Sequence, residues 1–226
     1  MAFRDYSEPS LRGGVAGPER GHRRRVIYRD GAKRCLDFAL VVLSLPISLP
    51  LILVMMCLVA LDGGNPLYRQ KRLGRGGRVF HLVKIRTMVP GADALLEYHL
   101  RKNPEARREW DETQKLKNDP RITRIGAFLR KSSLDELPQL WNVLRGEMSL
   151  VGPRPMMVDQ QALYPGTAYF DLRPGITGLW QISERNETSF AERAGFDNRY
   201  LASLSLSLDV SILLRTVSVV LRGTGY

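Results

Sequence analysis

The chain has 226 residues, enough for one sizeable domain or for a domain with an appendage. Lys and Arg outnumber Asp and Glu by 34 to 23. The formal net charge of +11 predicts a polyanionic partner such as nucleic acid, acidic lipid or a phosphorylated substrate. The two cysteines lie in or beside an apolar run, which argues against a disulfide framework, and the three histidines lack metal-ligand spacing, which argues against zinc.

The N-terminal part of the chain divides into a basic arm and an apolar run. Residues 1–32 are rich in Arg, Gly, Pro and Ser, and we expect them to be mostly disordered. The run FALVVLSLPISLPLILVMMCLVAL covers residues 38–61, 24 residues without a charge. As a straight helix it would span roughly 36 Å, enough to cross a bilayer core of about 30 Å. Pro46 and Pro50 predict a break or a sharp kink near its middle.

The charges on both sides of this run indicate how it enters a membrane. Seven Lys and Arg residues lie in residues 20–34 and seven more in residues 69–86. A spanning helix has fewer cations on one flank, and neither flank is depleted here. We therefore expect residues 33–62 to form a re-entrant helix hairpin that enters the membrane and leaves on the same, cytoplasmic face. A kinked transmembrane helix with the arm outside is the alternative.

Residues 63–226 form the predicted cytosolic domain, which we expect to be mainly α-helical with a small β element. The stretch LYRQKRLGRGGRVFHLVKIRTM predicts a short strand or hairpin near residues 79–85. Lys84 and Arg86 alternate with apolar residues, which places both cations on one face of an extended segment. Residues 92–117 are helical in pattern and charged, with a break expected around Pro104.

The segment RKSSLDELPQLW places two acids, Asp135 and Glu136, just after Arg130 and Lys131. One interpretation is structural, because Ser133 and Glu136 match an S-x-x-E capping box and Pro138 suits a first helical turn. The predicted helix then runs to Gly146. The other interpretation is chemical, with the same helix start presenting the acids to a substrate.

Two further loops carry candidate anion-binding residues. In SLVGPRP, Arg154 stands between two prolines, which suits bidentate binding of a phosphate or, alternatively, a surface turn. The stretch LRPGITGLWQISERN contains Arg173, Gln181 and Arg185, and either cradles a nucleotide or forms a turn. The C-terminal LDVSILLRTVSVVLRGTGY places its apolar residues on one helical face, which predicts an amphipathic helix that is interfacial or core-facing.

Several of these stretches together resemble the bacterial sugar transferases, also called monotopic polyprenyl-phosphate hexose-1-phosphate transferases. The resemblance covers roughly residues 33–226 and rests on KRCLDF before the apolar run, FHLVKIRTM, DPRITRIGAFLRKSSLDELPQLWNVLRGEMSLVGPRP, and RPGITGLWQISERN. The overall likeness is greatest to the exopolysaccharide members that transfer galactose or glucose. Leu49, where relatives often have Ser before the turn proline Pro50, and Glu184, where relatives usually have Gly, depart from the family pattern. Pro46 also remains a candidate for the turn.

The resemblance implies that a sugar 1-phosphate moves from a UDP-sugar to undecaprenyl phosphate at the cytosolic face of the bacterial inner membrane, with release of UMP. Following the family, we expect Asp135 to be the nucleophile that forms a covalent phosphosugar intermediate, and Glu136 to bind metal or handle a proton. Mg²⁺ suits a carboxylate pair that meets phosphate oxygens. Candidates for phosphate and uridine contacts are Lys84, Arg86, Arg130, Arg154, Arg173, Gln181 and Arg185.

Other readings of the sequence stay open at this point. One alternative is a direct mechanism, in which both substrates are bound at the same time and Asp135 acts only on the metal. A basic protein without catalysis, either membrane-anchored or bound to nucleic acid, is the alternative from another class, although no nucleic-acid-binding motif is present and we expect no such partner. The sequence names neither the sugar nor the oligomeric state.

Overall fold

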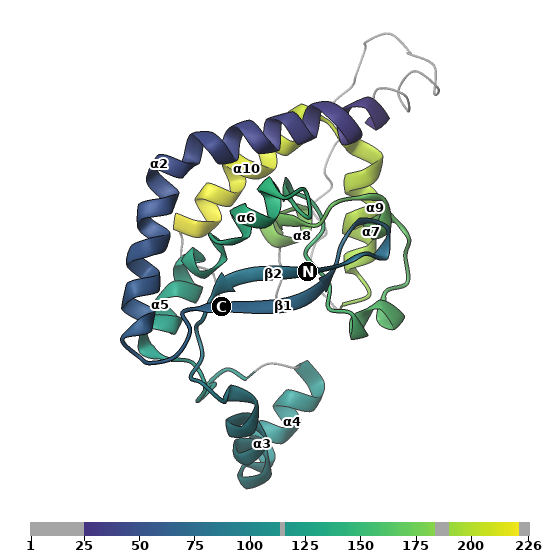
Figure 1. Ribbon diagram of the computed structural model, residues 1–226. Coiled ribbons are helices and arrows are strands. Elements are labelled where there is room, and N and C mark those ends of the chain that lie inside the picture. Colours follow the sequence, from purple (N-terminus) through teal and green to yellow (C-terminus); the bar gives the residue numbers. More distant parts are fainter. Residues whose placement is uncertain (1–24, 114–115, 184–189, 222–226) are drawn as a thin grey trace.

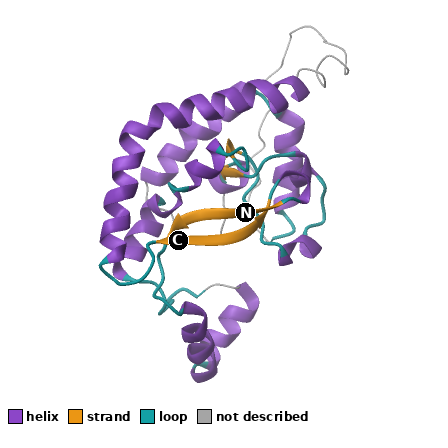
Figure 2. Cartoon of the chain, in the orientation of Figure 1, coloured by secondary structure: helices purple, strands orange, loops and turns teal. Residues whose placement is uncertain are grey.

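The structure is a computed structural model that describes residues 25–113, 116–183 and 190–221. As expected, it is mainly helical with a small β element (Figures 1 and 2). The longer helices are α2 (Lys33–Ala60), α3 (Ala92–Lys102), α4 (Pro104–Thr113), α5 (Arg124–Ser132), α6 (Gln139–Leu144), α9 (Arg193–Ser203) and α10 (Leu206–Leu221). Shorter helical pieces are η1 (Tyr28–Ala32), η2 (Arg75–Gly77), η3 (Leu134–Glu136), η4 (Asp159–Leu163), α7 (Ala168–Asp171) and α8 (Leu179–Ile182). The strands are β1 (Leu67–Leu73), β2 (Val79–Ile85), β3 (Ser149–Val151) and β4 (Gly175–Thr177).

The apolar run forms one continuous helix that bends near its middle (Figure 1). Pro46 and Pro50 both lie inside α2, so the predicted kink is present but the predicted break is not. Proline removes a backbone donor and pushes on the preceding turn, which bends a helix without necessarily ending it. Helical structure begins at Arg25, so the last residues of the expected arm continue into this helix. Among the described helices, Arg25–Ala60 is the one whose length and apolar composition suffice to cross a membrane.

A buried ion pair joins the start of α2 to the C-terminal helix. Lys33 Nζ lies 2.6 Å from Asp209 Oδ2 on α10, and both side chains are almost fully buried. The Asp209 carboxylate also accepts hydrogen bonds from the hydroxyls of Tyr28 and Tyr200, at 2.7 and 2.6 Å. Because a buried charge is tolerated only when it is paired and hydrogen-bonded, this network fixes α10 against α2.

A second set of polar contacts explains the remaining charges of KRCLDF. Asp37 is buried and accepts hydrogen bonds from Ser149 Oγ at 2.6 Å and from the Leu150 amide at 3.1 Å. Arg34 donates to the carbonyl oxygens of Val143 and Leu144, which are the last residues of α6. The Val143 carbonyl also accepts a hydrogen bond from the Gly146 amide at 2.9 Å, and the guanidinium adds its donors at this C-terminal end of α6. The first half of α2 is therefore tied to the domain at three places.

The predicted strand pairs with a second strand to form an antiparallel hairpin. In its register Lys84 lies opposite Tyr68, and Arg72 lies opposite Phe80, so these four side chains share one face. On β2, Phe80 packs into a core cluster with Val143 of α6. The alternate residues point to the other face of the hairpin. On that face Ile85 is fully buried and packs against the second half of α2. The hairpin thus lies between the bent helix and the segment that carries the acid pair.

The charged helix pair and the C-terminal helix both follow the sequence prediction. As predicted, residues 92–113 form two helices with a break at Pro104, and α3 and α4 pack on each other around Leu96 and Leu100 (Figure 1). The amphipathic C-terminal helix is also confirmed as α10. Its Ile212 is buried against the domain, whereas Leu214 and Val217 are 68% and 58% exposed. The stripe that the sequence left as either interfacial or core-facing thus points mainly outward.

Candidate active site

The acid pair lies in a short 3₁₀ turn between two helices. α5 ends at Ser132, the next residue Ser133 has a φ of 57° in the left-handed region, and η3 follows directly. The predicted capping box is wrong, because the Ser133 side chain makes no capping hydrogen bond. The left-handed conformation of Ser133 lets the chain change direction here, so a tight turn stands where the capping box was predicted. α6 begins at Gln139 after Pro138 and ends at Leu144, slightly before the predicted end.

Asp135 is buried with cations nearby and without an ion pair. It is 7% exposed, and Glu136 beside it is half-buried. Burial, together with the neighbouring Glu136 charge, raises the pKa of Asp135 to about 6, although Lys84 and Arg130 oppose the rise. Among the described residues, neither acid forms a direct ion pair. A carboxylate in this setting is poorly solvated and uncompensated, which suits a nucleophile.

Lys84 approaches the acids from β2. Its Nζ lies 5.5 Å from the ring centroid of Tyr68, directly across the hairpin. Burial lowers the pKa of Lys84, whereas the charges of Asp135 and Glu136 raise it. The ammonium group is therefore within electrostatic reach of both acids and is held over an aromatic face.

Asn142 fixes the distance between this lysine and the acids. Its side-chain amide accepts a hydrogen bond from the Val83 amide at 3.1 Å and donates to the His81 carbonyl at 2.8 Å, as a neighbouring strand would. It also donates to Glu147 Oε2 at 2.7 Å. Asn142 is 1% exposed and lies on α6, which follows the acid pair in the chain. One side chain thus joins the segment with the acids to the strand with the lysine.

Arg130 is positioned by a close contact between α5 and the end of β2. Its Nε donates to Thr87 Oγ1 at 2.9 Å. A Cβ at Gly126 would collide with the Thr87 carbonyl group, so only glycine allows α5 to lie this close. Thr123 caps α5 by accepting from the Gly126 amide at 2.9 Å, and its own amide donates to the Thr87 carbonyl at 3.1 Å. These contacts aim the guanidinium of Arg130 toward Asp135, whose charge raises the pKa of Arg130 against the lowering by burial.

The loop that carries Arg154 is held by a pair of short parallel strands. β3 and β4 pair in parallel, and the Gly152 amide donates to the Thr177 carbonyl at 2.8 Å while the Gly175 amide donates to the Pro153 carbonyl at 2.7 Å. Cβ atoms at Gly152 or Gly175 would clash with the opposite backbone, so the glycines permit this approach. Arg154 follows directly between its two prolines and is therefore presented from a fixed backbone.

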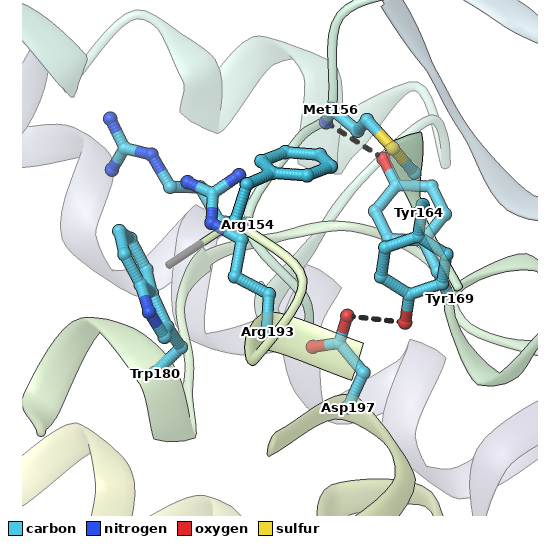
Figure 3. Close-up of a pocket in the computed structure, with 8 residues that line it drawn as sticks. Arg154, Met156, Tyr164, Tyr169, Trp180, Arg193 and Asp197 are labelled. Atoms are coloured by element: carbon cyan, nitrogen blue, oxygen red, sulfur yellow. Dashed lines mark hydrogen bonds between the residues drawn. The ribbon is translucent and has the colours of Figure 1, made fainter. Parts of the chain in front are cut away.

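Arg154 and Arg193 face a small aromatic cavity, which we call the arginine cavity (Figure 3). Its volume is about 10 Å³, the size of one water molecule. The Cζ atoms of Arg193 and Arg154 lie 4.2 and 5.8 Å from the ring centroid of Trp180. The lining residues are Arg154, Met156, Tyr164, Tyr169, Trp180, Phe190, Arg193 and Asp197. Two guanidinium groups thus converge on an enclosed space beside a single carboxylate.

Arg72 connects the arginine cavity to the acid pair. It lies on the hairpin face that also carries Lys84, and it donates to the Pro155 carbonyl at 3.0 Å and to Gln70 Oε1 at 2.6 Å. Burial and the charge of Arg154 together lower the pKa of Arg72 to about 10, and the charge of Glu136 opposes this lowering. The side chain is therefore within electrostatic reach of both ends of the site.

The structure brings together only some of the predicted site residues. Lys84 and Arg130 surround the acids, and Arg154 lies in the arginine cavity. Arg86 instead donates to the carbonyls of Val59, at 3.1 Å, and Gly63, at the C-terminal end of α2. Arg173 donates to the Gly146 carbonyl at 3.0 Å, beyond the end of α6. For both arginines a substrate contact remains only a prediction.

Two predicted residues fall outside the described part of the chain, namely Arg185 and Glu184. Gln181 is described and buried, and neither atom of its amide has a hydrogen-bond partner. Such an orphaned buried amide is costly, so we keep Gln181 as a candidate for a substrate contact.

Sequence reasoning missed Arg72 and Arg193. Arg72 lies in a run of seven cations, where only its strand register, opposite Phe80, separates it from its exposed neighbours. Arg193 follows at the start of α9, and no motif surrounds it. Asp197, one turn further along α9, accepts a hydrogen bond from the Tyr164 hydroxyl at 2.8 Å. Burial raises the pKa of Asp197 to about 6.

The acid pair is a plausible donor set for one kind of metal ion only. In residues 25–113, 116–183 and 190–221, no group of three or more His, Cys, Asp or Glu side chains gathers as a metal site. Zinc and calcium take several protein ligands, whereas Mg²⁺ is commonly held by one or two carboxylates together with substrate phosphates and water. Adjacent carboxylates without ion-pair partners fit that pattern.

The family model for bacterial sugar transferases matches residues 28–223, and the chain belongs to this family. The chain is 50% identical over 195 residues to a UDP-galactose-lipid carrier transferase of Erwinia amylovora, which covers 85% of this chain and 41% of that protein. It is 48% identical over 197 residues to the exopolysaccharide production protein ExoY of Rhizobium meliloti, covering 86% and 87%. It is 45% identical over 195 residues to an undecaprenyl-phosphate galactose phosphotransferase of Salmonella typhimurium, covering 85% and 41%. The chain thus spans about two fifths of the length of the Erwinia and Salmonella relatives.

Proposed function

We propose that this protein transfers a hexose 1-phosphate, galactose or glucose, from a UDP-sugar to undecaprenyl phosphate and releases UMP. The names of the Erwinia, Salmonella and Caulobacter relatives support this class of donor and acceptor. The observation that carries the proposal is the buried Asp135, which faces Lys84 and Arg130 without a direct ion pair. The name of the Rhizobium relative supports a role in exopolysaccharide production, and we propose that the transfer is its first membrane step.

In the proposed first step, a carboxylate oxygen of Asp135 attacks the phosphorus that bears the sugar. The bond from this phosphorus to the bridging oxygen breaks, and its electron pair leaves with UMP. The product is an aspartyl phosphosugar. In the second step an oxygen of the lipid phosphate attacks the same phosphorus, and the carboxylate of Asp135 leaves.

The charges around Asp135 support both steps. Lys84 and Arg130 lie where negative charge accumulates on the transferring phosphoryl oxygens, and burial keeps water away from the acyl phosphate. Glu136 and Asp135 would hold Mg²⁺, which supplies neutralising charge to the diphosphate when bound. Glu136 is the more exposed of the two acids, and it is the better placed to bind the metal while Asp135 reacts.

We further propose that α2 is a re-entrant membrane helix with both ends at the cytosolic face. Its bend supports this arrangement, as do the outward apolar residues Leu43 and Ile47, which are 76% and 78% exposed. The outward stripe of α10 would then rest in the interface between headgroups and lipid chains. Membrane lipid and undecaprenyl phosphate therefore reach the protein from the same side.

The topology is tested by thiol labelling with a reagent that does not cross membranes. Cys35 lies near the start of α2, and a substitution Asn65→Cys in a Cys57→Ala background adds a thiol in the exposed segment after the helix. A re-entrant helix predicts that both thiols react in inverted vesicles and neither reacts in intact cells. Labelling of one thiol from outside would show that the helix spans the membrane instead.

The activity is tested with the full chain in nanodiscs that contain undecaprenyl phosphate, together with Mg²⁺ and a panel of UDP-sugars. The Salmonella relative serves as the positive control. We expect a lipid-linked sugar phosphate and an equal amount of UMP with UDP-galactose or UDP-glucose. If no UDP-sugar gives product while the control is active, the proposed function is wrong and a basic protein without catalysis becomes the better account.

A further inference from the structure

Among the described residues, the arginine cavity and the neighbouring Arg72 carry more positive than negative charge. Arg154, Arg193 and Arg72 lie within electrostatic reach of one another, and their mutual repulsion adds to burial in lowering the pKa of Arg72 and of Arg193 to about 10. Asp197 lines the cavity, and its carboxylate accepts a hydrogen bond from Tyr164. In the described part of the chain, Asp197 is thus the one carboxylate that lines the cavity beside these guanidinium groups.

Arg72 also keeps a donor unused. Its Nη atoms bond to the Pro155 carbonyl and to Gln70, but Nε is buried and has no hydrogen-bond partner. Leaving a buried charged donor unpaired is unfavourable, and an oxygen of an anionic ligand would satisfy it. This observation is independent of the charge count, and it points to the same class of ligand.

The position of the cluster relative to the acids indicates which anion it binds. Lys84 lies opposite Tyr68 at one end of a hairpin face, and Arg72 lies four residues further along β1, about 13 Å away at about 3.3 Å per residue. The charge of Arg72 helps lower the pKa of Lys84, so the two side chains are within electrostatic reach, and Arg72 senses Glu136 as well as Arg154. An extended diphosphate laid on this face therefore has one phosphate near Asp135 and the other near the arginines.

We propose that Arg72, Arg154 and Arg193 form the site for the leaving nucleoside monophosphate. The inference rests on the proposed function and adds an orientation to it: the sugar-bearing phosphate lies at Asp135, and the phosphate of UMP lies against the arginine cluster. When the bond between the two phosphates breaks, its electron pair and the new negative charge go to the UMP oxygen beside these guanidinium groups. Trp180, which Arg193 covers at 4.2 Å, forms the wall on the nucleoside side.

Two features of the cavity fit a site that binds a phosphate at its mouth. The volume of about 10 Å³ excludes the base itself and leaves room only for an oxygen of the phosphate beside the guanidinium groups. The hydroxyl of Tyr164 and the carboxyl of Asp197 lie together behind Arg193 (Figure 3). Asp197 is one turn from Arg193 on α9, and its charge partly offsets the lowering of the Arg193 pKa.

The experiment measures binding of UMP and of uridine to the full chain in detergent or nanodiscs by equilibrium dialysis. The variants are Arg72→Gln and Arg193→Gln, with Arg72→Lys and Arg193→Lys as milder changes that retain the charge. Arg199→Gln is the matched control, because Arg199 is on the same helix and stacks on Phe196 at 4.3 Å but is exposed and outside the cavity. Uridine is the matched ligand, because it lacks only the phosphate.

We expect the dissociation constant of UMP to rise about tenfold or more in each Gln variant, because each loses a charge-assisted hydrogen bond. The dissociation constant of uridine should change little, and Arg199→Gln should bind both ligands as the wild type does. Equal weakening of UMP and uridine would show general damage, and unchanged UMP binding would show that the arginines do not contact the phosphate. Either result overturns the inference. Lipid-linked product from the wild type would leave the proposed function standing in both cases.

Discussion

The acid pair and the arginine cavity lie at two ends of one hairpin face, and the chain assembles them in different ways. Asp135 and Glu136 are neighbours in a three-residue turn, and their cationic partners come from two nearby elements. Arg72, Arg154 and Arg193 come from a strand, a loop and a helix that are far apart in the sequence. The first region depends on local backbone geometry, whereas the second depends on tertiary packing. Substitutions in the two regions should therefore fail in different ways.

The largest expected effect is at the nucleophile. Asp135→Asn removes the attacking carboxylate and keeps the shape of the side chain, so we expect turnover to fall at least about a thousandfold. Binding of UMP should remain, because the arginine cavity is intact. Formation of the lipid-linked sugar measures the first effect, and Asp93→Asn on the exposed part of α3 is the control. Activity within about tenfold of the wild type would remove Asp135 from the chemistry.

Lys84 should have the next largest effect and should alter the pH dependence as well. Lys84→Gln removes a cation that stabilises both the Asp135 carboxylate and the transferring phosphoryl group, and we expect turnover to fall about a hundredfold. Because Lys84 lowers the pKa of Asp135, the acidic limb of the pH profile should also move to higher pH. Arg69→Gln, on the opposite face of the same hairpin, is the control. An unshifted limb would place Lys84 away from the acid.

Asn142 tests whether the two ends of the site depend on a shared clamp. Asn142→Asp keeps an acceptor for the Val83 amide but loses the donor to the His81 carbonyl and sets a charge beside Glu147. We expect turnover to fall about tenfold through displacement of Lys84. Combined with Lys84→Gln, the second substitution should add little. Full additivity in this double-mutant cycle would show that Asn142 acts on stability alone.

The wild-type pH profile tests the burial of the acid. With the pKa of Asp135 at about 6, the nucleophile is ionised at neutral pH, and the rate of UMP release should fall about tenfold per pH unit below this value. The measurement is single-turnover release of UMP between about pH 5 and pH 8. A flat profile down to about pH 5 would show that Asp135 is not desolvated as the structure indicates.

The smallest expected effect is on stability. Asp135→Asn should stabilise the fold, although the same substitution abolishes activity. The pKa of Asp135 is 3.8 when unperturbed and about 6 in the folded protein, so the folded state binds the proton more tightly. Stability from this group is greatest below about pH 4 and is lost as the pH rises through about 6, at an upper cost of about 3 kcal/mol. Asp135→Asn removes the cost of the buried charge, but the new amide would itself be buried without hydrogen-bond partners. The free energy of unfolding should therefore rise by only about 1 kcal/mol above pH 6.

The thermal midpoint of the purified protein measures this gain. We expect a rise of about 2 to 4 °C in Asp135→Asn at pH 7.5, and no rise near about pH 3, where Asp135 is largely protonated in both states. The Asp93→Asn control should show neither effect. A loss of stability at pH 7.5 would mean that the Asp135 charge is compensated in the folded protein.

The sequence predicts those features that depend on local pattern. The apolar run, the strand at residues 79–85, the paired helices around Pro104 and the amphipathic C-terminal helix all follow from periodicity and turn residues. The acid pair was found for the same reason, because its members are adjacent. The capping box failed because Ser133 takes a left-handed conformation, which a motif shared with ordinary helix starts does not reveal.

Tertiary contacts explain what the sequence does not predict. Arg86 and Arg173, which the sequence offers as phosphate ligands, also donate to carbonyl groups beyond helix ends, and the sequence does not predict these contacts. Arg72 and Arg193 look like solvated charges, and only the hairpin register and the packing of α9 place them beside Arg154. The helical path through Pro46 and Pro50 likewise depends on where the two halves of α2 pack.

The most direct test of the account is to mix the purified enzyme with Mg²⁺ and UDP-galactose or UDP-glucose in the absence of any lipid acceptor. We predict a burst of about one UMP per enzyme and, by intact-protein mass spectrometry, an added hexose phosphate that peptide mapping places on Asp135. Both signals should be absent in Asp135→Asn. Release of UMP only after undecaprenyl phosphate is added, with no adduct at any time, would contradict the covalent role of Asp135 and favour direct transfer between the two substrates.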